Sequence, residues 1–223
     1  ISGDYRDSEG TNISRVGDER DGFQSLNLGI SGTWSFSDGV HIDYSIRHID
    51  RETDFDRFDF FVTGLPADAE NRTNSKYLYA GLSLEQKVSE TLNHSITFNR
   101  TDSDNETIDA DPVNDLTKGT KDVFKYQLNY LSSLHSFSAL LEHESQDYTQ
   151  SGQASFFGDP NKRLKSKTKS FAAEYRVSPG AFNISASWRI DNNTEFENAN
   201  SWRITANRQF GAGSEVFVSA GES

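Results

Sequence analysis

The sequence predicts an all-β fold, an antiparallel transmembrane β-barrel, with about 11 strands in its 223 residues. Three observations predict it: apolar and polar residues alternate with a period of two, tight and long connections alternate, and aromatic residues gather at two depths. Only 34% of the residues are hydrophobic and the mean hydropathy is -0.71, yet 12% are aromatic. Such a chain has more to bury than a disordered one, and it suits strands with one apolar and one wet face.

The alternation is clearest between residues 25 and 47. Its apolar positions are Leu26, Leu28, Ile30, Trp34 and Phe36 and, after a turn at 37–39, Val40, Ile42, Tyr44 and Ile46. Polar residues such as Asn27, Asp43 and Arg47 occupy the opposite face. The pattern returns at 78–85, 92–99, 124–130, 136–142, 170–177, 182–191 and 202–210, and partial strands at 1–6 and 215–221 complete the expected set.

The connections between these segments alternate in length. Tight turns are expected at 37–39, 88–90, 132–135, 178–181 and 211–214, and long connections at 7–22, 54–75, 104–120 and 150–167, with a shorter one at 195–200. Short turns on one rim and long loops on the other are typical of outer-membrane barrels. A soluble sandwich rarely separates its loops by length in this way.

Aromatic residues on the apolar face provide an independent indication. One group lies near the tight turns and comprises Trp34, Phe36, Tyr130, Tyr175, Phe182 and Phe210; the other lies toward the long connections and comprises Phe23, Phe98, Phe124, Phe171, Trp188 and Trp202. Two rows at two depths are what the interfacial girdles of a membrane barrel require.

The polar face predicts a wet lumen, or one filled by another polar protein element. Its charged residues would be costly in a dry core; they are Arg47, Lys125, Glu142, Glu174, Arg189 and Arg203. An open sheet in lipid leaves unpaired edges, so further strands are needed to close the barrel. We therefore expect residues 1–223 to be a fragment of a barrel domain, with the remaining strands and any plug outside this chain.

Composition excludes several classes of site. The sequence contains no run of about 20 apolar residues, so no transmembrane helix is expected. The absence of cysteine excludes disulfides and thiolate metal sites. A formal net charge of -12 disfavours nucleic acid as a partner. No nucleophile motif is present, and we expect no enzyme activity, although His41 beside Asp43 on the polar face leaves general-base chemistry open.

Residues 11–15 and 17–23, together with the strand that follows to Phe36, resemble the TonB-dependent outer-membrane receptors, most closely the cobalamin and siderophore transporter branch. Residues 218–223 resemble a mid-barrel strand of that family. The resemblance implies a 22-stranded barrel, about half of it here, occluded by an N-terminal plug. It implies uptake of siderophore-iron, cobalamin or a similar scarce nutrient with TonB-derived energy.

The location implied is the outer membrane of a Gram-negative bacterium. The partners would be its lipid and lipopolysaccharide, the TonB complex acting through the plug, and a small-molecule or metal-chelate ligand. Two alternatives stay open from the residues alone. One is a passive porin-like or substrate-specific channel, and the other, less favoured, is an outer-membrane barrel enzyme.

Two early long connections are acidic. Asp18 and Asp21 lie in the first, and Asp54 and Asp56 in the second. Hard oxygen ligands in flexible loops suit Ca²⁺, and the resemblance implies calcium there, because cobalamin transporters bind it with aspartates of these loops. A solvated acidic loop without a metal is the alternative interpretation.

The second of these connections is also apolar. It contains Phe55, Phe58, Phe60 and Phe61. An exposed apolar loop often marks a binding surface, so we take these four residues as candidates for contact with the ligand. Packing against neighbouring loops, or insertion into the outer leaflet, is the alternative.

Overall fold

The computed structural model describes residues 1–12, 14, 17–59, 62–109, 115–156 and 158–222. In this part of the chain, 11 antiparallel strands form one sheet whose order follows the sequence. The strands are β1 (Ser2–Ser8), β2 (Phe23–Ser37), β3 (Val40–Phe58), β4 (Pro66–Lys87), β5 (Leu92–Ile108), β6 (Asp115–Leu131), β7 (His135–Ser151), β8 (Lys162–Val177), β9 (Phe182–Asn193), β10 (Ala199–Phe210) and β11 (Ser214–Glu222). The predicted class and strand number are confirmed.

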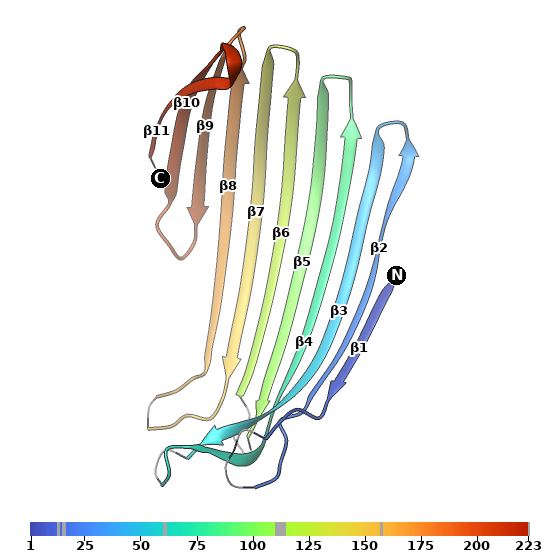
Figure 1. Ribbon diagram of the computed structural model, residues 1–223, viewed down its shortest axis with the longest axis vertical. Helices are drawn as coiled ribbons and strands as arrows, with labels where there is room; N and C mark the ends of the chain where they lie inside the picture. The colour runs from blue at the N-terminus through green and yellow to red at the C-terminus, as the bar shows by residue number, and fades with distance from the viewer. Residues whose placement is uncertain (13, 15–16, 60–61, 110–114, 157, 223) are drawn as a thin grey trace.

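The sheet has two rims of different character (Figure 1). Tight turns join β2 to β3, β4 to β5, β6 to β7 and β8 to β9 at the upper rim, and the short helix η1 (Gly211–Gly213) joins β10 to β11 there. Gly39 and Gly180 adopt φ values of 100° and 65° in two of these turns, a conformation that favours glycine. The longer connections lie at the opposite rim. The alternation of turn lengths is therefore as predicted.

Strand register separates the side chains into two faces. In one row across β3, β4 and β5, Tyr44 pairs with Leu82 and Leu82 with Phe98. In the next row, Asp43 pairs with Ser83 and Ser83 with Thr97. The apolar row belongs to the face we call outward, and the polar row to the face we call inward.

The outward apolar side chains are exposed. Leu82 and Ile204 each expose 51% of their surface, and the described residues include no buried hydrophobic one. A continuous apolar face of this size requires an apolar medium. From Phe182 to Ile190 a strand rises about 26 Å at roughly 3.3 Å per residue, which a tilt of about 40° reduces to about 20 Å, close to the height of about 25 Å of a barrel's lipid-facing band.

The long connections are shorter than the sequence indicated. β3 continues to Phe58 and β4 begins at Pro66, so the connection is 59–65 rather than 54–75. Likewise β5 ends at Ile108 and β6 begins at Asp115, and β7 and β8 are separated by residues 152–161. Backbone pairing needs no apolar face, so strands continue past the apolar band wherever cross-strand ion pairs replace it. Alternation disappears there while pairing persists.

One aromatic residue was placed on the wrong face. Phe23 is an odd-numbered residue of β2, like the inward-facing Ser25 and Asn27, and the guanidinium of Arg51 lies 5.5 Å from its ring centroid. It therefore belongs to the inward face and not to the lipid-facing girdle. Separately, the described residues contain no helix that is long and apolar enough to cross a membrane.

Candidate functional site

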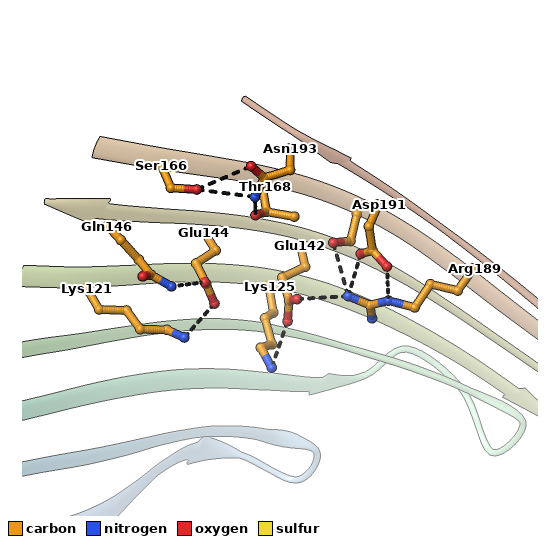
Figure 2. Close-up of polar contacts among 11 residues, drawn as sticks. Lys121, Lys125, Glu142, Glu144, Gln146, Ser166, Thr168, Arg189, Asp191 and Asn193 are labelled. Atoms are coloured by element: carbon orange, nitrogen blue, oxygen red, sulfur yellow. Dashed lines mark hydrogen bonds and ion pairs between the residues drawn. The ribbon is translucent and has the colours of Figure 1, made fainter. Parts of the chain in front are cut away.

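The most extensive polar feature of the inward face is a row of side chains across β6 to β9. Register alone aligns it: Lys125 pairs with Glu142, Glu142 with Ser170, and Ser170 with Asp191. Arg189 lies two positions before Asp191 on the same strand and therefore on the same face. Figure 2 shows Lys125 of β6, Glu142 of β7 and Arg189 and Asp191 of β9 pointing toward one another.

Charged contacts join the row into one network. Lys125 Nζ lies 2.8 Å from Glu142 Oε2, and Arg189 Nη2 lies 3.3 Å from Glu142 Oε1. Arg189 also donates to both carboxylate oxygens of Asp191, at 2.9 and 2.7 Å, and to Ser170 Oγ at 3.1 Å. Glu142 is the most enclosed of the four charged members, with 15% of its side chain exposed. Two cations and two anions alternate, so the network carries no net charge.

A second set of contacts lies beside it, toward the rim of long connections (Figure 2). Lys121 Nζ lies 2.7 Å from Glu144 Oε2, and Asn193 Nδ2 donates to Thr168 Oγ1 at 2.7 Å. In the other direction, a groove of about 660 Å³ follows the inward face over β7 to β11, where small side chains such as Ser138, Ser187 and Ser219 alternate with Glu174 and Arg203. The inward face therefore offers a charged, hydrogen-bonding wall to water, to a polar cargo or to another protein element.

The sequence indicated the members of this network as lumenal residues but not their mutual contacts. The pairing of Lys125 with Glu142 depends on the register of β6 and β7, and that of Arg189 with Glu142 spans a further strand. A shift by one residue would move every one of these side chains to the outward face. The alternation within one strand indicates which face a side chain lies on. The alignment between two strands depends on both of them and cannot be read from either strand alone.

A second candidate site is an acidic cluster at the rim of long connections. The β1–β2 connection docks on the β3–β4 hairpin: Asp54 N donates to Gly22 O at 2.9 Å, and Glu19 N donates to Asp68 Oδ2 at 3.3 Å. Of the predicted calcium residues, Asp21 is thereby brought near Asp54 and Asp56. Asp18 borders a shallow depression that Asp54 also lines.

Electrostatics confirm the crowding of carboxylates in this cluster. Partial burial, and then repulsion from Asp56 and Asp54, raise the pKa of Asp21 above its ordinary value. Partial burial and repulsion from Asp56 and Asp68 raise the pKa of Glu19 in the same way. Asp56 Oδ2 and Asp68 Oδ1 are buried without a hydrogen-bond partner among the described residues. Within those residues, no group of three or more carboxylates or histidines is placed to hold a metal ion.

Asp68 and Glu70 were not among the predicted site residues. They lie at the start of β4, inside the segment that the sequence suggested to be a loop. Asp68 and Glu70 repeat the alternate acidic pattern of Asp54 and Asp56. This repeat could have indicated them, because a hairpin formed by the segment brings its two acidic stretches near one another.

The candidate ligand-contacting phenylalanines divide into two groups. Phe55 lies within β3 opposite Asn71, and Phe58 pairs with Pro66 at the end of the hairpin and is 55% exposed. Phe60 and Phe61 lie outside the described residues. Val62 and Leu65, in the same connection, expose 84% and 42% of their surface. The tip of the β3–β4 hairpin is therefore apolar and exposed.

His41 and Asp43, the candidates for general-base chemistry near the tight-turn rim, form hydrogen bonds with different partners. His41 Nδ1 lies 2.9 Å from Ser35 Oγ, whereas Asp43 accepts a hydrogen bond from Thr33. Asp43 therefore has a different hydroxyl partner from His41. This arrangement is that of cross-strand polar pairs on a sheet.

Neither a protein-family model nor a curated protein matches the sequence. Solved structures match by fold. The RagAB peptide importer in its closed-closed state aligns with a TM-score of 0.62 at 12% identity, over 90% of this chain and 33% of that chain. The ferric citrate transporter FecA in its unliganded form gives 0.61 at 11% identity, over 90% and 36%. BauA, the ferric preacinetobactin receptor from Acinetobacter baumannii, gives 0.55 at 12% identity, over 96% and 41%.

This chain thus spans between a third and two fifths of the length of these three structures. At such low identity the similarity establishes the fold and nothing finer. The chain has the fold of a transmembrane β-barrel wall, of the kind found in these importers and receptors.

Proposed function

We propose that the chain is part of an outer-membrane receptor of a Gram-negative bacterium that imports a scarce nutrient with TonB-derived energy. In this proposal the rest of the barrel, about 22 strands in all, and the plug belong to the same protein. The observation that carries the proposal is the ion-paired row on the inward face of a barrel wall with the fold of nutrient importers. A transporter of this kind is not an enzyme.

The fold neighbours and the sequence resemblance support the ligand class proposed here. FecA and BauA are described as a transporter of ferric citrate and a receptor for ferric preacinetobactin, and RagAB as a peptide importer. A ferric chelate, cobalamin or a short peptide is therefore the cargo proposed here. Outward contacts would be with membrane lipid and lipopolysaccharide, and the plug would contact the TonB complex.

Uptake by cells producing the full-length protein tests this function. Radiolabelled ferric citrate, ferric siderophores, cobalamin and short peptides would be offered with and without TonB. We expect concentrative uptake of one of these probes and its loss without TonB. Uptake that only follows the concentration gradient and persists without TonB, with ion conductance in planar bilayers, would instead establish the passive channel, which the hydrated inward face also suits.

The acidic rim cluster is proposed as a Ca²⁺ site formed by Asp18, Asp21, Asp54 and Asp56. The unpartnered carboxylate oxygens of Asp56 and Asp68 and the raised pKa values of Glu19 and Asp21 indicate crowded anionic groups, although Arg72 forms an ion pair with Asp54. Since three ligands do not yet converge, binding would have to draw the two connections together. Calorimetry on the full-length protein should detect Ca²⁺, and Asp18→Ala with Asp21→Ala should abolish the heat. A parent protein that binds no Ca²⁺ ends the proposal.

The exposed hairpin tip is proposed as the first contact for the ligand, through Phe55, Phe58, Phe60 and Phe61. Its apolar side chains sit at the rim where cargo would arrive, beside the acidic cluster. We expect Phe58→Ser to weaken capture of the transported probe by intact cells. The matched control is Phe196→Ser in the β9–β10 connection, where Phe196 is 74% exposed. Equal effects of the two changes would remove the hairpin from recognition.

A further inference from the structure

A run of cations follows the outward face of β8 just beyond the apolar band. Five of the eight residues from Lys162 to Lys169 are lysine or arginine, and none is acidic. Four of these cations share one face, because Arg163, Lys165, Lys167 and Lys169 pair in turn with Thr149, Asp147, Ser145 and His143 of β7. We call these four cations with Asp147 the basic sector. It is unusual in a chain whose net charge is -12.

The basic sector contrasts with the same level of the sheet on β3 to β6. There the outward charged residues, which we call the acidic sector, are Asp50, Glu52, Asp54, Arg72, Lys76, Arg100, Asp102, Asp104, Glu106, Lys118 and Asp122. Each of its four cations contacts at least one carboxylate. Seven acids against four bases give it a charge of -3, whereas four bases against one acid give the basic sector +3.

Two cations of the basic sector lack a counter-ion. Asp147 contacts both Arg163 and Lys165, each at 2.8 Å. In the part of the chain that the structure describes, neither Lys167 nor Lys169 has an ion-pair partner, and both are exposed. Their cross-strand neighbours are Ser145 and His143 on β7 and, for Lys169, Asn192 on β9.

These two ammonium groups lie at the edge of the lipid-facing band. Lys169 precedes Phe171 by two residues, and the Phe171 ring meets that of Trp188 edge-on, with centroids 5.7 Å apart. At roughly 3.3 Å per residue, Lys169 lies about 7 Å and Lys167 about 13 Å beyond this aromatic pair along the strand. Aromatic girdles mark the membrane–water interface, so the lysines lie at the level of lipid headgroups.

The neighbouring strand leaves this side accessible. β9 ends at Asn193, and its hairpin with β10 is visibly shorter than β7 and β8 (Figure 1). Beyond Thr168 none of the described strands pairs with β8 on that flank, although Thr194 of the β9–β10 connection hydrogen-bonds to the backbone N and O of Lys167. Because both lysine side chains are exposed, a headgroup can approach Lys167 and Lys169 from the lipid.

We propose that the basic sector binds the phosphate groups of an anionic lipid in the leaflet next to the long connections, with Lys167 and Lys169 as the principal contacts. An ammonium forms short, charge-assisted hydrogen bonds with phosphate oxygens. The lipid's acyl chains would lie on the apolar band below, against Phe171 and Trp188. A free phosphate ion lacks that second contact, so the site selects a lipid. This inference rests on the outer-membrane location proposed above, for which it names a lipid site, and it is independent of the cargo transported.

Native mass spectrometry of the full-length protein in detergent tests the proposal, with diphosphorylated lipid A titrated against the parent and Lys167→Gln/Lys169→Gln. Each lysine at an anionic lipid surface contributes about fivefold in affinity, so the double variant should bind roughly 25-fold more weakly. The control Lys76→Gln/Lys118→Gln changes the charge equally but in the acidic sector, and should bind lipid A like the parent.

Two further arms identify the source of the phosphate. Dephosphorylated lipid A should bind the parent as weakly as lipid A binds the double variant, and inorganic phosphate should not displace bound lipid A at equal concentration. Unchanged affinity of Lys167→Gln/Lys169→Gln, an equal loss in the control variant, or full displacement by inorganic phosphate would each overturn the proposal.

Discussion

The two faces of the same strands differ in the partners of their side chains. On β6, Phe124, Tyr126 and Leu128 point outward without polar partners, while Lys125 between them reaches Glu142 across the inward face. Inward polar contacts occur at every height, from Thr33 with Asp43 near the tight turns to Lys121 with Glu144 near the other rim. Among the residues that the structure describes, ion pairs on the outward face occur only beyond the apolar band. The medium on each side, rather than strand propensity, therefore sets the residue types.

The largest effect is expected from a charge on the lipid-facing band. Leu28→Arg or Trp188→Arg should destabilise the folded barrel by about 2–4 kcal/mol, because an arginine near the bilayer midplane loses its hydration. The matched inward changes Asn27→Arg and Ser187→Arg should cost clearly less. Urea titration of the full-length protein in lipid vesicles measures the difference. Equal costs on neighbouring residues would refute the assignment of faces.

The next effect concerns the inward network. Arg189→Gln removes the guanidinium that contacts Glu142, Ser170 and Asp191, and should lower the free energy of unfolding by about 1–3 kcal/mol, since Glu142 is then left enclosed with a single cation. Adding Glu142→Gln should recover part of the loss. Arg203→Gln, an exposed arginine on the same face, is the control. A double variant whose losses simply add would show that the network is not coupled.

A smaller effect is expected from protonating the acidic rim cluster. The pKa values of Glu19 and Asp21 are raised in the folded chain by partial burial and repulsion. The folded state therefore binds these protons more tightly than the unfolded state does, so docking of the β1–β2 connection strengthens as pH falls through the raised pKa values. It levels off below the unfolded values and weakens toward neutral pH.

Amide hydrogen exchange at Asp54, whose N–H donates to Gly22 O, reports this docking. After correction for the intrinsic pH dependence of exchange, protection should increase from pH 7 toward pH 4. Asp56→Asn should reproduce the increase at pH 7 and flatten the pH dependence. Protection that falls with acidification would contradict the repulsion described here.

The smallest effect belongs to the exposed ion pairs of the acidic sector. Lys118 Nζ lies 2.9 Å from Asp104 with both side chains about half exposed. Lys118→Ala should change the free energy of unfolding by less than about 1 kcal/mol, because solvent screens such pairs. A larger loss in the same urea titration would mean that these outward pairs are shielded from water, and the band of lipid contact would then extend further along the strands.

Most of the barrel wall was predictable, because each strand alternates apolar residues that face lipid with polar residues that face water. Leu82 between Ser83 and Gly81 identifies a face without knowledge of any other strand. The strand ends were not predictable in this way. At Asp50, Glu52 and Asp54 the outward positions are as polar as the inward ones, so alternation disappears while pairing with β4 continues.

The candidate sites were predictable to different degrees. Asp21, Asp54 and Asp56 were suggested by composition, and the fold brings them near one another, while Asp68 joins them only because β4 begins inside the expected loop. The contact of Arg189 with Glu142 depends on two successive registers. That Lys167 and Lys169 lack an ion-pair partner depends on the β7–β8 register, which places Ser145 and His143 beside them, and on β8 beginning at Lys162, inside the connection expected at 150–167.

The central claim is that alternate residues of these strands face lipid and water. Residues 1–223 contain no cysteine. Once any cysteine elsewhere in the full-length protein is replaced by serine, single-cysteine variants from residue 24 to residue 36 can each carry a nitroxide label at one defined position in bilayers. Collision rates with oxygen, which partitions into lipid, and with a water-soluble nickel chelate should alternate with a period of two. Leu26, Leu28, Ile30 and Trp34 should favour oxygen, and Ser25, Asn27, Ser31 and Thr33 should favour nickel. Uniform accessibility along β2, or alternation with the opposite phase, would contradict the account.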